Sequence, residues 1–131
     1  MTLRIAVLGL GEAGSEIARD LVSAGADVVG YDPLPIRVDR VRPSGSEAEA
    51  VASADVVLSV NSSHDARTAL DNALPGLRAG TLWADLNTAS PGLKVALAER
   101  AKQHDVPVVD VALMAPVPGK GLRTPMLVAG E

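Results

Sequence analysis

Short apolar runs recur along the chain and predict the strands of a β-sheet. These runs lie at residues 3–8, 27–31, 56–60, 82–85, 106–111 and 126–128. Most of them are near-continuous in Val, Leu and Ile, a pattern typical of parallel strands that are covered on both faces. We therefore expect a parallel sheet that is buried between two layers of other structure.

The segments between these runs carry apolar residues at helical spacing. They predict helices at residues 11–24, 46–53, 65–74 and 91–103. Gly25 stands where the end of a helix favours a left-handed residue, and Ser63 is available as an N-cap. Ser90 followed by Pro91 is a strong helix start. Prolines between residues 32 and 46 break any long helix there and leave a short edge strand at 38–42.

The repeated order of strand, helix and strand predicts a doubly wound α/β fold. Parallel strands joined by right-handed crossovers place helices on both faces of the sheet, which gives a three-layer α/β/α sandwich. The chain has 131 residues, which suits one domain spanning 1–131.

A glycine-rich loop joins the first predicted strand to the first predicted helix. It consists of Gly9, Leu10, Gly11, Glu12, Ala13 and Gly14. This G-x-G-x-x-G pattern is a weak signal alone, but its place between a strand and a helix is the context that dinucleotide binding requires. Gly9 would make a tight turn, Gly11 would admit a pyrophosphate close to the backbone, and Gly14 would let the helix pack on the strand. The free N–H groups of that helix would hold the anion, as in a Rossmann-type fold.

An acidic residue follows the second predicted strand. Asp32 lies 18 residues after Gly14, where a carboxylate accepts hydrogen bonds from an adenosine ribose and repels a 2′-phosphate. This position favours NAD over NADP. The alternative role for Asp32 is that of a turn residue. Arg37, Arg40 and Arg42 lie close enough in the sequence to leave NADP open.

Composition excludes several other classes of function. Hydrophobic residues make up 47% of the chain, which excludes disorder. A net charge of −4, with one Trp, one Tyr and no Phe, argues against nucleic acid as a partner. The chain has no cysteine, and its two histidines lack ligand spacing, so we expect no metal site. No run reaches the roughly 20 apolar residues of a membrane span, and we expect a soluble, cytoplasmic protein.

Three motifs follow one another along the chain: residues 5–14 with the glycine loop, residues 56–61, and residues 80–91. In this order they resemble the N-terminal NAD(P)-binding domain of the 6-phosphogluconate and β-hydroxyacid dehydrogenases. The third motif is the most specific, because it is similar to that family's Gly-x-x-x-x-Asp-x-Ser-Thr-x-x-Pro stretch. The resemblance covers essentially the whole chain. It implies that Glu12 and Ala13 supply backbone around the pyrophosphate and that Asn61 and Thr88 lie on the nicotinamide side. The alternative roles are a strand end for Asn61 and a turn cap for Thr88.

Two departures from the family pattern bear on function. The family's substrate loop reads Asp-x-Pro-Val-Ser-Gly-Gly, whereas in this chain Met114 replaces the substrate-binding serine and Ala115-Pro116 replaces the glycine pair. This suggests a divergent branch of the family. The family's catalytic lysine lies on a helical C-terminal domain that is absent from these residues. The resemblance thus implies the cofactor half of an NAD(P)-dependent oxidoreductase acting on a CH–OH group, with no catalytic acid or base identified. It would take a small-molecule substrate only together with a C-terminal domain, and a homodimer is open.

A regulatory NAD-sensing module is the alternative function. Such a module shares the glycine loop, an acidic residue after the second strand and a similar length. Residues 87–91 and the loop after Asp110 stand against it, because a sensor has no need of them.

Overall fold

A computed structural model of the chain describes residues 2–61, 65–87, 90–113, 117, 119, 121 and 126–130. In chain order its elements are β1 (Arg4–Leu8), α1 (Glu12–Ser23), β2 (Asp27–Tyr31), β3 (Arg42–Pro43), α2 (Glu47–Val51), β4 (Val56–Ser59), α3 (Ala66–Ala73), the 3-10 turn η1 (Leu74–Gly76), β5 (Leu82–Asp85), α4 (Pro91–Lys102), β6 (Val108–Leu113) and β7 (Met126–Gly130). The strands and helices predicted from the apolar pattern are confirmed, with bounds that shift by a few residues.

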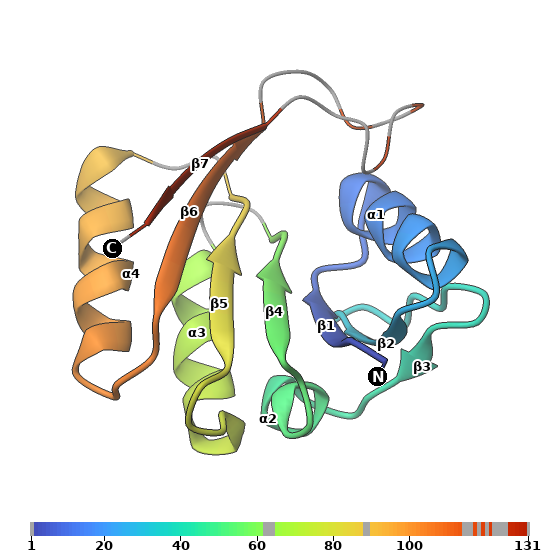
Figure 1. The fold of residues 1–131 in the computed structure, drawn as a ribbon, viewed down its shortest axis with the longest axis horizontal. Helices are drawn as coiled ribbons and strands as arrows, with labels where there is room; N and C mark the ends of the chain where they lie inside the picture. The colour runs from blue at the N-terminus through green and yellow to red at the C-terminus, as the bar shows by residue number, and fades with distance from the viewer. Residues whose placement is uncertain are drawn as a thin grey trace.

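The strands form one sheet in the order β3-β2-β1-β4-β5-β6-β7 (Figure 1). All pairs from β3 to β6 are parallel, so that Ile5 of β1 lies between Val28 of β2 and Val56 of β4. This is the doubly wound Rossmann order, in which the chain reverses direction across the sheet between β1 and β4. Ligands of such sheets bind outside the carboxyl ends of the strands at this switch point.

Two of the predicted strands differ from the structure. β7 runs antiparallel to β6, with Asp110 opposite Ala129. A parallel neighbour would need a crossover connection, usually a helix, whereas an antiparallel strand can return directly. Residues 114–125 contain three prolines and two glycines, which disfavour a crossover helix. The edge strand predicted at 38–42 is reduced to Arg42–Pro43, and Val38 and Val41 pack into the core instead.

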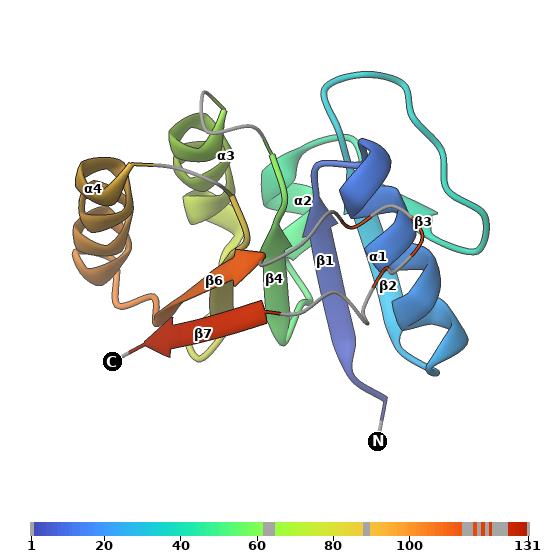
Figure 2. The same ribbon diagram turned by 90° about the horizontal axis from the view of Figure 1, so that it is seen from above.

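Helices cover both faces of the sheet, as Figure 2 shows from above. α2, α3 and α4 lie on one face, where Trp83 of β5 packs with Leu70 of α3 and Leu97 of α4. α1 lies on the other face, where Ile17 packs against Ala84 of β5. None of the helices in the described part of the chain is long and apolar enough to cross a membrane.

Two of the three predicted helix ends are confirmed. Gly25 has a φ of +98° directly after α1, and its N–H donates to the Val22 carbonyl at 3.0 Å. Ser90 is the N-cap of α4, and its hydroxyl oxygen accepts from the Leu93 N–H at 3.3 Å. The N-cap of α3 is Asp65, so the assignment of this cap to Ser63, which lies outside the described residues, is wrong.

Candidate functional site

The glycine loop lies at the switch point, where β1 ends and α1 begins. Gly11 is the N-cap of α1 and, because it has no side chain, it caps none of the N–H groups of the first turn. The first N–H groups of a helix have no partner within it, and the helix dipole adds partial positive charge there. The loop therefore presents backbone donors and a positive potential at the carboxyl edge of the sheet.

Gly9 and Gly14 are required by the fold itself. Gly9 has a φ of +99°, a conformation that residues with a side chain rarely adopt, and a Cβ there would meet the carbonyl oxygen of Val60, directly after β4. A Cβ on Gly14 would meet the carbonyl oxygen of Gly9. The two glycines thus let β1, β4 and α1 approach closely around the turn.

Gly11 differs from these two glycines. A Cβ on Gly11 would find no atom of the described residues within 4 Å. Its φ of −67° is ordinary for any residue, and it is exposed. Nothing in the described part of the chain therefore requires a glycine at this position. The open space above Gly11 fits an anionic group that approaches the backbone.

The other three loop residues have distinct surroundings. Leu10 is buried in the core on the α1 face, and Ala13 packs partly buried against Ile17 and its neighbours. Glu12 is exposed in the first turn of α1. These three residues thus offer a ligand mainly their backbone.

Asp32 ties the glycine loop to the segment after β2. One carboxylate oxygen accepts from the Leu10 N–H at 2.8 Å, and the other accepts from the Leu34 N–H at 2.9 Å. The second bond is that of a turn residue, so this alternative role is realised. Each oxygen of a carboxylate offers about two acceptor sites. Asp32 can therefore accept a hydroxyl donor without releasing either backbone amide.

The three arginines considered for a 2′-phosphate lie in different places. Arg42 forms a bidentate ion pair with Asp27, with distances of 2.8 and 2.9 Å. Asp27 begins β2 and Asp32 follows its end, so the two aspartates lie roughly 16 Å apart at about 3.3 Å per residue. Arg42 is therefore removed from the ribose position. Arg37 and Arg40 are exposed in the loop after Asp32 and form no ion pair with other described residues.

Tyr31 ends β2 beside Asp32. Partial burial of its ring, with the nearby carboxylates of Glu47 and Asp32 adding to the effect, raises the pKa of the Tyr31 phenol. The phenol is consequently neutral at physiological pH and adds no negative charge at this edge.

A network of polar side chains joins the ends of β4 and β5 to β6 and α4, and the sequence-based prediction missed most of it. Its members, called here the strand-end network, are Asn61, Ser59, Asn87, Asp85, Lys94 and Asp110. The sequence signal was present, because Asp85 ends one predicted strand with a polar side chain and Ser59 lies one residue before the end of another. Of the two residues expected on the nicotinamide side, Asn61 belongs to this network. Thr88 lies outside the described residues, as does Met114.

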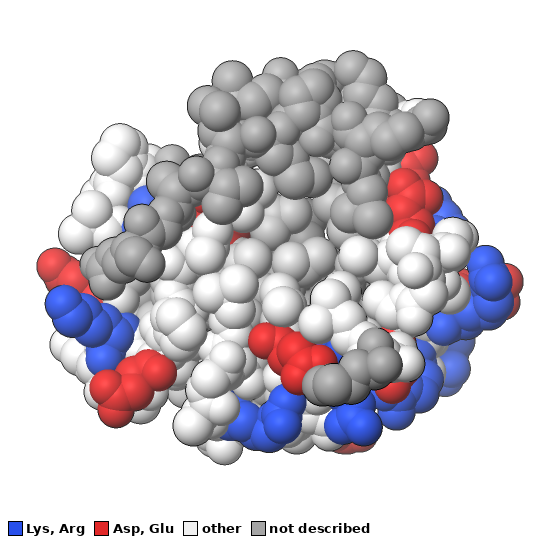
Figure 3. Space-filling model, in the orientation of Figure 1, with Lys and Arg blue, Asp and Glu red and all other residues white. Residues whose placement is uncertain are grey.

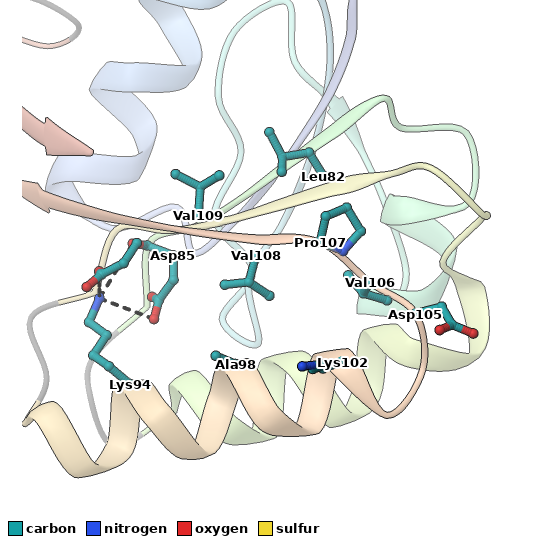
Figure 4. Close-up of a pocket in the computed structure, with 11 residues that line it drawn as sticks. Leu82, Asp85, Lys94, Ala98, Lys102, Asp105, Val106, Pro107, Val108 and Val109 are labelled. Carbon is teal, nitrogen blue, oxygen red and sulfur yellow. Dashed lines mark hydrogen bonds and ion pairs between the residues drawn. The ribbon is translucent and has the colours of Figure 1, made fainter. Parts of the chain in front are cut away.

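Contacts within the strand-end network are short. Asn61 Nδ2 and Asn87 Nδ2 each donate to Ser59 Oγ at 3.0 Å. Asn87 Nδ2 also donates to Asp85 Oδ1 at 2.7 Å. Lys94 Nζ lies 3.2 Å from Asp85 Oδ2 and 2.7 Å from Asp110 Oδ1 (Figure 4). The network thus links the strand ends to α4.

A cavity of about 610 Å³ lies between α4 and β6 (Figure 4). Its lining is mostly apolar, as at Ala98 and Val108, and Lys94 with Asp85 closes one end. No residue of the glycine loop lines this cavity. It is therefore separate from the candidate dinucleotide site.

The segment after β6 contacts α1. Val117 is buried against Ile17, and the Gly119 N–H donates to both carboxylate oxygens of Glu16 at 3.0 and 3.1 Å. These contacts join the end of β6 to the helix that begins at the glycine loop.

Charged side chains lie along the two sides and the lower edge of the face drawn in Figure 3, and its described middle is largely uncharged. Acidic and basic residues lie next to one another along its lower edge. Neither the acidic nor the basic residues form a continuous charged patch across the described part of this face.

Comparison with known proteins finds a family and relatives that match most of this chain. The family described as the NAD binding domain of 6-phosphogluconate dehydrogenase matches residues 4–121. A probable 3-hydroxyisobutyrate dehydrogenase of Mycobacterium bovis is 31% identical over 132 residues, covering 96% of this chain and 45% of the relative. The chain thus spans about half the length of the curated relatives it matches.

Solved structures agree with this match. 3-Hydroxyisobutyrate dehydrogenase of Mycobacterium tuberculosis, solved with L-serine, superimposes with a TM-score of 0.91 at 31% identity, covering 100% of this chain and 47% of that one. A variant of an imine reductase from Myxococcus stipitatus in complex with NAD⁺ has a TM-score of 0.88 at 23% identity, with coverage of 100% and 48%. The second likeness shows the shared fold.

Proposed function

Because the chain belongs to the family of NAD-binding domains of 6-phosphogluconate dehydrogenase, we propose that it holds a nicotinamide dinucleotide across the carboxyl ends of β1, β2 and β4. The bound cofactor would serve hydride transfer in an oxidoreductase that acts on a CH–OH group, as in hydroxyacid dehydrogenases. NAD is the expected cofactor and NADP the second candidate.

The observation that carries this proposal is the open space at Gly11. Packing explains Gly9 and Gly14, but no neighbour among the described residues explains the absence of a side chain at Gly11. The position lies at the N-terminus of a twelve-residue helix, where backbone donors and the helix dipole attract an anion. A pyrophosphate that approaches the backbone accounts for all of these features.

Each remaining part of the cofactor has a residue assigned to it. The backbone of residues 9–14 would surround the pyrophosphate, and Asp32 would accept from the adenosine ribose. Asn61 and Thr88 would lie on the nicotinamide side. When bound, the nicotinamide supplies the hydride chemistry, and the protein supplies its position and surroundings.

Substrate binding is proposed for the whole protein and not for these residues alone. Relatives about twice as long as this chain carry names of dehydrogenases for 3-hydroxyisobutyrate and 2-(hydroxymethyl)glutarate. We propose a small hydroxyacid-like substrate, bound together with a C-terminal domain, and a cytoplasmic location. A homodimer stays open as a prediction that gel filtration with light scattering would test.

Titration of the chain with NADH, followed by calorimetry, tests cofactor binding. Gly11→Val is expected to weaken binding at least tenfold, because the side chain would occupy the place of the pyrophosphate. Gly92→Val is the matched control, since Gly92 lies in the first turn of α4 and a Cβ there also meets none of the described atoms within 4 Å. Equal affinities of the wild type and Gly11→Val, or no binding by the wild type, would contradict the proposal.

A further inference from the structure

The strand-end network has an ordered direction from α4 to the glycine loop. It begins at Asp110 and Lys94, continues through Asp85, Asn87 and Ser59, and ends at Asn61. The backbone nitrogen of Asn61 lies 3.1 Å from the place that a Cβ on Gly9 would occupy. One end of the network therefore adjoins the candidate cofactor site.

Burial fixes the middle of the network. The exposed fractions of Ser59, Asp85 and Asn87 are 1%, 2% and 4%. A buried polar group is costly unless it is hydrogen-bonded, and a buried carboxylate requires a charged or hydrogen-bonding partner. Lys94 supplies the charge against one oxygen of Asp85, and the backbone N–H and Nδ2 of Asn87 supply hydrogen bonds to the other.

These bonds also fix which way the amide of Asn87 faces. An ionised carboxylate only accepts hydrogen bonds, so Asn87 must direct its NH₂ group and not its carbonyl toward Asp85. The same NH₂ group then reaches Ser59 Oγ. Asn87 thereby holds the Ser59 hydroxyl in one place.

Ser59 in turn orients Asn61. Its oxygen accepts from Asn61 Nδ2, so the carbonyl oxygen of the same amide faces away from Ser59. Among the described residues, none donates a hydrogen bond to Asn61 Oδ1. Asn61 thus presents an oriented and unused acceptor beside the glycine loop.

We propose that Ser59 and Asn87 are positioning residues that hold the Asn61 carbonyl oxygen for a donor on the nicotinamide riboside half of the cofactor. Asp85 and Lys94 anchor them from the side of α4. This inference rests on the proposed function and assigns the orientation of the nicotinamide half to a network that reaches α4.

NADH and ADP together test this inference, because ADP has the adenosine and pyrophosphate but lacks the nicotinamide riboside. We expect Ser59→Ala to raise the Kd of NADH about three- to tenfold, the range of one hydrogen bond, and to change the Kd of ADP less than about twofold. Asn87→Ala should give the same pattern if Ser59→Ala does not fold, as judged by thermal melting. Asn61→Ala removes the acceptor itself. Neither Ser59→Ala nor Asn87→Ala should therefore raise the Kd of NADH more than Asn61→Ala does.

Asp55→Asn is the matched control. Asp55 is an exposed aspartate directly before β4, at the opposite end of that strand from Ser59, and its loss should leave both ligands unaffected. Equal weakening of NADH and ADP would show that the network only supports the fold and would overturn the inference. Unchanged NADH binding by a folded Ser59→Ala or Asn87→Ala would overturn it as well. A wild type that binds neither ligand would instead refute the proposed function.

Discussion

Asp32 combines two tasks in one carboxylate. It accepts the N–H of Leu10 from the glycine loop and that of Leu34 from its own turn. The bond from the Leu34 N–H joins residues two positions apart, so it can be predicted from the sequence. The bond to Leu10 joins two loops that are adjacent only because β1 and β2 pair, so it could be predicted only after the fold.

Cofactor preference is the first property that depends on Asp32. A charge-assisted hydrogen bond to a ribose hydroxyl contributes about 1.5–3 kcal/mol, whereas a 2′-phosphate would face a charge of the same sign. We expect the chain to bind NADH at least about tenfold more tightly than NADPH, and Asp32→Ser to reduce this ratio. Fluorescence titrations of both cofactors at fixed ionic strength measure it.

Asp39→Ser is the control for this substitution, because Asp39 is an exposed aspartate of the same loop. Tighter binding of NADPH by the wild type would assign Asp32 to the turn alone. A ratio of NADPH to NADH affinity that Asp32→Ser leaves unchanged would lead to the same conclusion.

Gly11 and Gly14 are expected to respond differently to the same substitution. Gly14→Ala should lower the free energy of unfolding by about 1–3 kcal/mol, because its Cβ would meet the Gly9 carbonyl oxygen and force the backbone apart. Gly11→Ala should leave stability nearly unchanged, since its Cβ meets no atom within 4 Å in the described part of the chain. Urea denaturation of both variants measures the difference. Similar losses in the two would mean that both glycines serve packing.

At the scale of elements, the apolar pattern predicted each strand and helix that carries the site. It did so because covered parallel strands must be apolar along their whole length. The direction of β7 was not predictable in this way, since a short apolar run is alike in parallel and antiparallel pairing. The strand-end network was also missed, because Lys94 reaches Asp85 from a helix whose rotation about its axis the sequence does not specify.

Lys94 is expected to matter for the attachment of α4. Lys94→Met would leave the carboxylate of Asp85 without its ionic partner, and removing one member of a buried pair typically costs about 3–5 kcal/mol. Asp110→Asn should cost far less, because the Asp110 side chain is 46% exposed. Chemical denaturation of the two variants compares them. A loss for Lys94→Met no larger than that for Asp110→Asn would show that Asp85 does not depend on this pair.

For the whole molecule, the 131-residue chain is expected to bind NADH without turning over a substrate. The ammonium group of Lys94, which belongs to the strand-end network, is held between two carboxylates and is poorly placed to exchange a proton. Purified chain incubated with NAD and either 3-hydroxyisobutyrate or 6-phosphogluconate should therefore produce no NADH above a blank without protein. Steady production of NADH would refute this.

The pairing of β1 with β4 has a consequence for the order of folding. Its contacts join residues far apart in the chain, as between Arg4 and Asp55, which lie 51 positions apart. Contacts that close long loops tend to form late, after local units such as β1, α1 and β2. The glycine loop lies at this late-forming seam, since a Cβ on Gly9 would meet the carbonyl of Val60, directly after β4. Bound NADH should therefore slow amide hydrogen exchange more in β1 and β4 than in the β6–β7 pair. Ligand-free chains would then open first at the place where the cofactor enters.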